Sequence, residues 1–501
     1  MALRQTFAAL LLACFAFSAS AAAEEGHKGA PEVNRKGDES AHGLPAEAVT
    51  NHAITIDGEK ISFTARAGAL RLRDAQTEAP QADVAFVSYE RAGVDGATRP
   101  VAFIFNGGPG AGSAWLQLGA LSPFRLRISR ETLTPSATPT IIDNAESWIT
   151  FTDLVFIDPP GTGFSKILTD SDDVRKRFFS VDGDANALAV VIRKWLTAHG
   201  RLASPKFLVG ESYGGFRCVK LVNALRAHEN IGVNGLILVS PVLDFTVITG
   251  ERHPLRYATL LPSLAAISRH ATTRAPLADA EIYAAGDYVT DYLKGAKDPD
   301  AISRMSAQVA ELVGLDRQTV ARLGARIDPK TFARERPNDQ TRVLSVYDAS
   351  VSGFNPDPSS PDPDWADPVL ESWRAPLGAA ITRLTLERLA WPIADARYVV
   401  LNGDVSNRWD FGHGGRTGAE VLSDLRAALA LDPTLRALII HGLYDLVTPY
   451  FATKLMLDQI SAYGDPARVS LLALRGGHMP YLEEESRKAM RDAAKSLFER
   501  R

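Results

Sequence analysis

Short apolar runs, separated by polar, helical or glycine-rich segments, recur between residues 101 and 239. Runs of this length are typical of strands that are buried on both faces of a sheet. One intervening segment, residues 184–199, has the amphipathic spacing of a helix. The pattern predicts a mostly parallel sheet with helices on both faces. Its expected strands are Val101–Phe105, 154–157, 207–209 and Gly235–Val239.

Before this region the hydrophobic pattern has a period of two. Residues 52–65 alternate between apolar and polar side chains and are interrupted by Asp57-Gly58, a dipeptide typical of two-residue hairpins. Residues 84–89 form a further apolar run. We expect these segments to form an antiparallel edge of the sheet.

After residue 245 the alternation of strands and helices stops. Helical periodicity at 302–313 and 317–323 is followed by a stretch rich in proline and aspartate at 355–367. Buried strands return at 437–440 and 469–473, and an amphipathic helix is expected at 483–500. The pattern predicts a core in two parts, 51–245 and 435–501, interrupted by a largely helical cap with loops at 246–434.

The first 23 residues have the pattern of a secretory signal peptide. Arg4 precedes an apolar run at 7–17, and Ala21-x-Ala23 fits a cleavage site. The apolar run is too short to span a bilayer, and because it continues past Cys14 we do not expect a lipid anchor there. Residues 24–50 are polar and aperiodic, which predicts a flexible leader. The chain is therefore expected to be exported, either to a periplasm or out of the cell, without stable membrane insertion.

Composition and charge narrow the function classes. The 501 residues are 46% hydrophobic and 23% charged, with a formal net charge of -4, which is ordinary for a soluble enzyme. The chain has no long basic run, so nucleic acid is not an expected partner. Of its two cysteines, Cys14 would leave with the signal peptide, and Cys218 alone can form no internal disulfide.

The chemistry is concentrated in residues 206–225. Here an apolar run, the sequence Gly210-Glu211-Ser212-Tyr213-Gly214 and an amphipathic segment follow one another directly. G-x-S-x-G between a strand and a helix is the nucleophile elbow, a tight turn that exposes the serine oxygen above a sheet. Ser212 is therefore the candidate nucleophile, and a plain strand-to-helix turn is the alternative.

A serine hydroxyl needs a general base and a group that orients this base. In elbow enzymes the acid and the histidine follow the serine in chain order. Asp445 comes shortly after the strand at 437–440, and His478 is the one histidine beyond it, in a glycine-rich loop after the last strand. Chain order and position at strand ends together favour a Ser212–His478–Asp445 triad over two unrelated loop residues.

An oxyanion hole requires two backbone N–H groups that point at the developing charge. One is expected from Tyr213 and the other from the loop Asn106-Gly107-Gly108, directly after the strand Val101–Phe105. A phosphate-binding role for this loop is disfavoured, because it lacks both the G-K-[ST] ending and the G-x-G-x-x-G spacing.

The motifs resemble, in order, those of the serine carboxypeptidase family, which has the α/β-hydrolase fold. The matching segments are spread over most of the chain outside the leader and the cap. They are FNGGPG at 105–110, WITFTDLVFIDPPGTGFS at 148–165, GESYGG at 210–215, GLYDLVTP at 442–449 and GGHMP at 476–480.

The resemblance implies roles for further residues. Asn106, Gly107 and Glu211 would bind the terminal carboxylate of the substrate, Gly108 and Tyr213 would donate to the oxyanion, and Met479 would flank the pocket. Two departures stand out. Better-known members of the family carry several disulfides, and they have a second glutamate where this chain has Ala120. Gln117, three places earlier and on the same face if the segment is helical, is the candidate to replace that glutamate as the partner of Glu211, and the alternative is that the partner is absent.

These observations predict an exported serine-type carboxypeptidase that acts through an acyl-enzyme on peptides with a free C-terminus. No metal or organic cofactor is expected. An esterase or acyltransferase on the same triad is the alternative, since one triad serves both kinds of leaving group. A non-catalytic binding protein is disfavoured, because all parts of the machinery are present. The sequence indicates neither the preferred C-terminal side chain nor the oligomeric state.

Overall fold

A ten-stranded, mostly parallel sheet organises the part of the chain that the computed structural model describes, residues 43–127, 134–169, 171–250, 253–360, 363–395 and 397–499. Its strand order is β1-β2-β3-β7-β4-β9-β10-β13-β14, with β8 paired to β3. The strands are β1 (Ala48–Ile56), β2 (Glu59–Arg73), β3 (Pro80–Arg91), β4 (Val101–Phe105), β7 (Asp153–Ile157), β8 (Lys166–Ile167), β9 (Lys206–Glu211), β10 (Gly235–Val239), β13 (Arg436–Gly442) and β14 (Val469–Leu474). The predicted signal peptide and most of the predicted leader lie outside the described residues.

Strands β7, β4, β9, β10, β13 and β14 are parallel, whereas β1, β2 and β3 form the antiparallel edge that the sequence predicts. The hairpin between β1 and β2 turns at Asp57 and Gly58, which both have a positive φ. Strand β1 begins at Ala48, inside the segment predicted as leader, and the backbone N–H of Leu44 already donates to Asp83.

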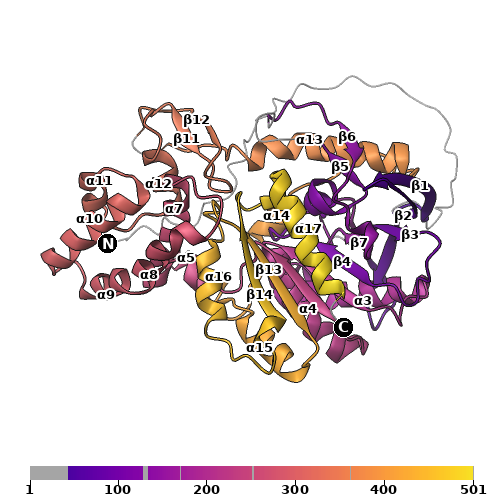
Figure 1. Cartoon of the computed structure of the whole chain (residues 1–501). Coiled ribbons are helices and arrows are strands. Elements are labelled where there is room, and N and C mark those ends of the chain that lie inside the picture. The colour runs from indigo at the N-terminus through magenta and orange to yellow at the C-terminus, as the bar shows by residue number, and fades with distance from the viewer. Residues whose placement is uncertain are drawn as a thin grey trace, which may run out of the picture. The chain divides into compact units, whose positions relative to one another are not determined.

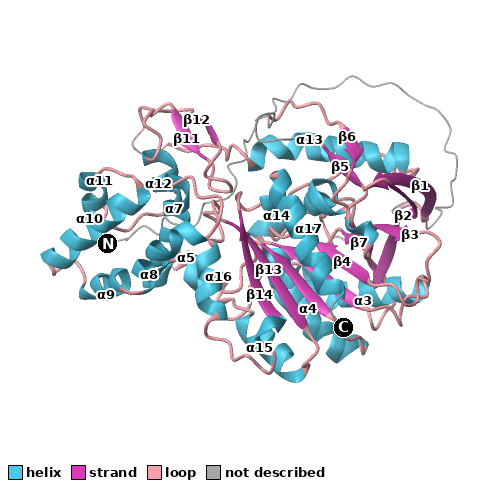
Figure 2. Cartoon of the chain, in the orientation of Figure 1, coloured by secondary structure: helices cyan, strands magenta, loops and turns pink. Residues whose placement is uncertain are grey.

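Helices cover both faces of this sheet (Figures 1 and 2). On the central strands, Phe103, Leu208 and Leu236 pack toward one face and their neighbours Ile104, Val209 and Ile237 toward the other. The first face is covered by α3 (Val181–Ala198), α4 (Tyr213–Glu229) and α15 (Leu422–Leu431), and the second by α1 (Ala114–Leu116), α13 (Leu370–Arg383) and α17 (Glu484–Glu499). The predicted α/β-hydrolase fold is confirmed.

The insertion between β10 and β13 has two structural parts. Helices α6 to α12 pack into a separate apolar cluster, which also includes Leu443 and Leu446 from the loop after β13. They are α6 (Pro254–Ala258), α7 (Leu261–Ser268), α8 (Ala278–Ala285), α9 (Asp287–Lys294), α10 (Pro299–Val313), α11 (Arg317–Arg322) and α12 (Pro329–Glu335). From α13 onward the chain returns to the core, where it pairs with core residues at Ala111↔Leu401, Gly163↔Val399, Ser180↔Asp410 and Asp244↔Glu420.

Shorter elements complete the fold. Two small two-stranded sheets are formed by β5 (Phe124–Leu126) with β6 (Ile141–Asp143) and by β11 (Arg342–Leu344) with β12 (Ser352–Phe354). The remaining helices are α2 (Asp172–Phe178), α5 (Phe245–Thr249), α14 (Gly403–Asn407) and α16 (Tyr450–Leu457).

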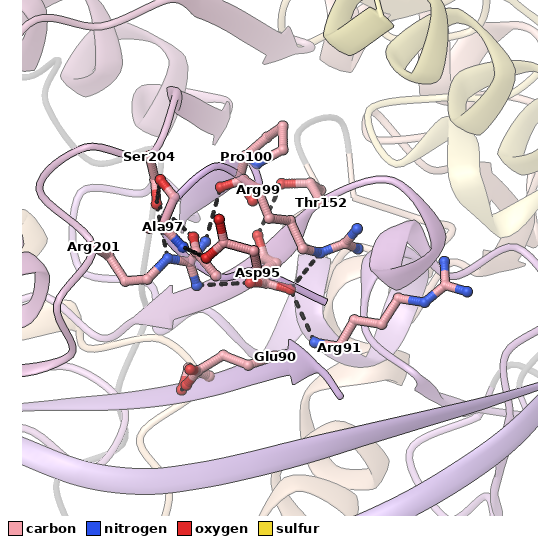
Figure 3. A network of polar contacts seen from close by, with 12 residues as sticks. Glu90, Arg91, Asp95, Ala97, Arg99, Pro100, Thr152, Arg201 and Ser204 are labelled. Atoms are coloured by element: carbon pink, nitrogen blue, oxygen red, sulfur yellow. Dashed lines mark hydrogen bonds and ion pairs between the residues drawn. The ribbon is translucent and has the colours of Figure 1, made fainter. Parts of the chain in front are cut away.

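A buried network of ion pairs and hydrogen bonds joins the segments at the amino ends of the central strands (Figure 3). The carboxylate of Asp153 accepts from Arg99 Nε at 2.8 Å and from Arg201 Nη1 at 2.7 Å. Arg201 also donates to Ser204 Oγ and to the Arg99 carbonyl oxygen. Asp153 and Arg201 are 1% and 3% exposed, so water cannot replace these partners.

Replacing Arg201 with methionine is therefore expected to lower the free energy of unfolding by about 3 kcal/mol, because removal of one partner leaves a buried charge undercompensated. The matched control is Arg269→Met, which breaks a pair whose side chains are 32% and 63% exposed and should cost about 1 kcal/mol or less. Denaturant unfolding of both variants checks the prediction, and equal losses would contradict it.

Candidate active site

Ser212 lies at the tight turn between β9 and α4, with φ 59° and ψ −125°. A positive φ is strained for a residue with a side chain and is a recurrent feature of functional turns. The flanking glycines make the turn possible. A Cβ at Gly210 would lie 2.1 Å from the Gly214 carbonyl oxygen, and a Cβ at Gly214 would lie 2.7 Å from that of Phe105. The predicted elbow therefore has the backbone geometry that its motif requires.

The glycine-rich loop after β4 lies directly against this elbow. A Cβ at Gly107 would lie 2.5 Å from the backbone nitrogen of Tyr213, so only glycine fits there. Tyr213 is the first residue of α4, where a backbone N–H has no partner within the helix. Gly108 follows with φ 99°. The two segments predicted to supply the oxyanion hole are thus side by side.

Arg217 fixes the start of the same loop through a hydrogen bond to its backbone. Its guanidinium is 1% exposed, donates from Nη1 to the Asn106 carbonyl oxygen at 2.5 Å and from Nε to Asp184 at 2.6 Å. The ion pair joins α4 to α3, and its second hydrogen bond fixes the backbone at the start of the loop. Sequence reasoning did not identify Arg217, because nothing in the local pattern distinguishes it from a surface arginine.

Asp445 and His478 form a buried pair at the carboxyl edge of the sheet, beyond the ends of β13 and β14. The distance from Asp445 Oδ2 to His478 Nδ1 is 2.8 Å, and the two residues are 0% and 3% exposed. Asp445 Oδ1 accepts from the backbone N–H groups of Val447 and Thr448, and Oδ2 accepts from the Thr448 hydroxyl at 2.7 Å. The carboxylate is therefore held in one orientation, with one oxygen toward the histidine ring.

Opposing influences act on the pKa of His478. Burial lowers it, whereas the carboxylates of Asp445 and Glu211 raise it, and the result is a pKa above the ordinary value. This is the direction expected when a carboxylate stabilises the imidazolium that a general base becomes.

Glu211 is buried beside the nucleophile, and burial raises its pKa to about 7, against the lowering effects of His478, Tyr481 and Asn106. The Tyr481 hydroxyl donates to Glu211 Oε2 at 2.5 Å. At neutral pH the Glu211 carboxyl is thus available in its protonated form, which can donate a hydrogen bond.

The predicted partner of Glu211, Gln117, lies elsewhere, and this expectation needs correction. Its Nε2 donates to the Tyr89 hydroxyl at 3.0 Å, within the core beside β3. The prediction assumed α-helical spacing between Gln117 and Ala120, but residues Gln117–Leu121 form a π-helical turn. In such a turn residues three apart no longer share a face.

Tyr481 occupies the place next to Glu211 instead. Its ring fits because residue 119 is glycine: a Cβ there would lie 2.6 Å from the Tyr481 ring. In the sequence, Tyr481 follows His478 by three residues in a loop, and no motif or spacing connects it to Glu211.

Asn106 completes the polar surroundings of the nucleophile. Its Oδ1 accepts from the Leu116 backbone N–H at 3.1 Å, whereas its buried Nδ2 has no hydrogen-bond partner among the described residues. A buried amide donor without a partner costs free energy, which a bound acceptor would recover. Met479, predicted to flank the pocket, is 3% exposed and belongs to the apolar cluster on the α13 side of the sheet.

Other features of the described residues lie away from this site or carry no further chemistry. A cavity of about 990 Å³ lies at the amino ends of the strands, lined by Pro100, Pro205 and Asn234 among others, and its lining includes none of Ser212, Asp445 and His478. No group of three or more His, Cys, Asp or Glu within the described ranges is placed to hold a metal ion. The helices that the structure describes include none with the length and apolar character needed to cross a membrane.

Residues 60–263 match the model of the serine carboxypeptidase family, so the resemblance seen in the motifs is confirmed over this region. The matched region includes Asn106, Glu211 and Ser212 but neither Asp445 nor His478. The geometry places those two residues at the same edge of the sheet as the matched motifs.

Curated relatives match a smaller share of this chain. Serine carboxypeptidase-like 16 of Arabidopsis thaliana is 27% identical over 163 residues, which are 31% of this chain and 36% of that relative. The pheromone-processing carboxypeptidase kex1 of Aspergillus niger is 31% identical over 137 residues, 27% of this chain and 20% of that relative. The similarity thus spans about a third or less of the length of these relatives.

Among solved structures, a thermophilic esterase from Thermogutta terrifontis aligns with 86% of this chain and 99% of its own, at 14% identity and a TM-score of 0.34. A juvenile hormone epoxide hydrolase from Bombyx mori aligns with 87% of this chain and 78% of its own, at 14% identity and a TM-score of 0.36. These scores add nothing to the fold assignment, which rests on the strand order.

Proposed function

Because residues 60–263 match the serine carboxypeptidase family, we propose that this chain is an exported serine-type carboxypeptidase that removes C-terminal residues from peptides. One observation carries the proposal beyond the family match. A buried carboxyl with a raised pKa, Glu211, and a buried amide without a partner, Asn106, lie beside an elbow serine. Together they offer hydrogen-bond donors for a carboxylate next to the reacting atom.

In the proposed reaction His478 accepts the proton of Ser212 as its oxygen attacks the last peptide carbonyl. The backbone N–H groups of Gly108 and Tyr213 stabilise the negative oxygen of the tetrahedral intermediate. His478 then gives its proton to the leaving amino group, the terminal amino acid departs, and an ester to Ser212 remains. Water, deprotonated by His478, hydrolyses this ester and frees the serine.

Recognition of a free C-terminus requires that Glu211 be protonated, because two adjacent carboxylates repel each other. With a pKa of about 7, Glu211 can donate a hydrogen bond to the substrate carboxylate at neutral and lower pH, and the Tyr481 hydroxyl keeps it oriented. An ester or an amidated peptide offers no such carboxylate.

A matched peptide pair tests the proposal. Each peptide is supplied with a free C-terminus and as the C-terminal amide, and products are followed by mass spectrometry. Stepwise shortening from the C-terminus of the free acid, with the amide cleaved far more slowly, is expected. Hydrolysis of small esters without shortening of either peptide would favour the esterase or acyltransferase alternative.

The pH dependence of the same reaction gives a second prediction. As pH rises through about 7, Glu211 loses its proton, so KM for the free-acid peptide is expected to rise by up to about tenfold per pH unit. Hydrolysis of a small neutral ester should instead rise as His478 loses its proton, and it should show no loss as Glu211 ionises.

Glu211→Gln is the matched variant, since glutamine keeps the shape and a donor but cannot ionise. Its KM for the free-acid peptide should be nearly independent of pH between 6 and 8. If wild type and variant showed the same pH dependence of KM, Glu211 would not be the group that recognises the carboxylate.

Export rests on the sequence of residues 1–23 alone. Protein recovered from outside the cytoplasm should begin near Glu24 when its N-terminus is sequenced. A retained Met1 in the active protein would contradict cleavage of this segment.

A further inference from the structure

The turn between β11 and β12, residues 345–351, contacts both catalytic loops although it belongs to the insertion. This hairpin lies next to α12 (Figure 1). On the histidine side, the backbone N–H of His478 donates to the Tyr347 carbonyl oxygen at 2.6 Å, and that of Gly477 donates to Asp348 Oδ2 at 3.1 Å. Two consecutive residues of the loop that carries the general base are therefore held by two consecutive residues of the turn.

The acid loop is held in the same way. The N–H of Leu446 donates to the Val346 carbonyl oxygen at 3.1 Å. In the opposite direction, the N–H of Ala349 donates to the Tyr444 carbonyl oxygen, also at 3.1 Å. These contacts flank Asp445 on both sides. The Tyr444 hydroxyl also donates to the Ala271 carbonyl oxygen in the helical part of the insertion.

The turn approaches the histidine loop too closely for this contact to be incidental. A Cβ at Gly477 would lie 2.0 Å from the Tyr347 carbonyl oxygen and 2.5 Å from the Asp348 Cα. The Tyr347 ring lies edge-on to the His478 ring, with 5.3 Å between centroids and 89° between planes. Both the backbone and the imidazole of the base are thus in contact with residue 347.

The turn itself is internally fixed. Asp367 accepts from the Ser345 hydroxyl at 2.7 Å and from the Val346 N–H at 2.8 Å. The Ser345 oxygen in turn accepts from the N–H groups of Tyr347 and Asp348, each at 3.0 Å. Because these hydrogen bonds fix the backbone of the turn, the turn can determine the position of the loop that carries Gly477 and His478.

We propose that Tyr347 and Asp348 are positioning residues for His478, so that the insertion is part of the catalytic machinery as well as a cover over the sheet. The proposal rests on the Ser212–His478–Asp445 hydrolase described above, and it holds for ester and peptide substrates alike. Its physical basis is that a general base works only within hydrogen-bond reach of its nucleophile, and a displacement of about 1 Å costs about 100-fold in rate.

Two pairs of variants test the proposal. Tyr347→Leu removes the ring and Asp348→Ala removes the acceptor for Gly477, whereas Tyr347→Phe and Asp348→Asn keep them. Each of the first two should lower kcat about 10- to 100-fold with KM nearly unchanged, and the conservative variants should stay near wild type. Phe354→Leu, at an exposed position of the same hairpin, is the control and should have no effect.

A small ester is the first substrate, because its hydrolysis needs the triad but no carboxylate recognition. The inference can therefore fail or succeed independently of the carboxypeptidase proposal. The fold decrease in kcat should be equal for the ester and for the free-acid peptide. A rise in peptide KM with unchanged kcat would overturn the proposal and place Tyr347 in the substrate pocket.

The pH profile separates positioning from general stability. The titratable groups that interact electrostatically with His478 come from several elements. They are Asp445 after β13, Glu211 at the elbow, Asp367 beside the turn 345–351, and His441 on β13. Burial and the neighbouring carboxylates act on the pKa of His478 in opposite directions, so a displaced ring in Tyr347→Leu should have a different pKa, and the acidic limb of kcat should move. A reduced melting temperature with an unmoved limb and wild-type kcat in the folded fraction would overturn the proposal.

Discussion

Replacing Ser212 with alanine is expected to lower kcat by about 10³-fold or more for peptides and esters, with no loss of folded protein. In the proposed reaction the hydroxyl oxygen forms the acyl-enzyme, so no other group can take its place. Alanine has the same backbone, and its Cβ occupies the place of the serine Cβ at φ 59°. The elbow should keep its conformation, because it is held by its glycines and by the hydrogen bond from the Ser212 N–H to the Val239 carbonyl oxygen.

The matched variants are His478→Ala and the Ser212→Ala/His478→Ala double variant. Since nucleophile and base act as one unit, the double variant should lose little more than either single one. Circular dichroism and thermal unfolding establish that each variant is folded. A Ser212→Ala enzyme that kept more than about a tenth of the wild-type rate would remove Ser212 from the reaction.

Asp445→Asn is expected to lower kcat by about 10³- to 10⁴-fold, while KM changes little. The side-chain amide keeps an oxygen for the N–H groups of Val447 and Thr448, so the loop should survive. Its NH₂ group then faces His478 Nδ1, where the carboxylate oxygen stood at 2.8 Å. The imidazole is forced to place its proton on Nε2, the wrong tautomer for a base toward Ser212.

Thr448→Val serves as the comparison for Asp445→Asn. It removes the hydroxyl that donates to Asp445 Oδ2 but leaves the charge and both backbone donors. The loss of kcat in Thr448→Val should be far smaller than that in Asp445→Asn. Steady-state kinetics of both variants on one ester measure the ratio of their kcat values. If Asp445→Asn were as active as Thr448→Val, Asp445 would not be the orienting acid.

Local patterns in the sequence were sufficient to predict the parallel strands of the large sheet and the elbow. The parallel strands are short uninterrupted apolar runs because both faces of this sheet are covered, and β4 and β10 begin and end at the predicted residues. The elbow was predictable because steric limits at Gly210 and Gly214 leave a fixed spacing in the sequence. Asp445 and His478 followed from chain order and from their position after strands.

The remaining parts of the site depend on contacts between distant segments. Tyr481 meets Glu211 only because Gly119 leaves room for its ring, and the π-helical turn at Gln117–Leu121 turned the predicted partner toward Tyr89. The turn at 345–351 reaches the loops of Asp445 and His478 mostly through backbone groups, which are the same for every residue type. Side-chain pattern alone does not predict such contacts.

In the insertion, too, the sequence pattern predicts local helices but not contacts between distant segments. Helical periodicity correctly predicted α10 and α11, whose bounds are Pro299–Val313 and Arg317–Arg322. The return of the chain to the core after α13 is made by single bridges, such as Ala111↔Leu401 and Gly163↔Val399, which leave no periodic pattern.

Covalent labelling with a fluorophosphonate tests the central claim most directly, because the reagent modifies only an activated serine. After tryptic digestion the adduct should lie on the peptide 207–217, and it should be absent in Ser212→Ala. A peptide with a free C-terminus should slow the labelling at pH 6, whereas its C-terminal amide should not. Labelling at another residue, or equal protection by both peptides, would contradict a carboxypeptidase that uses Ser212 and recognises the terminal carboxylate.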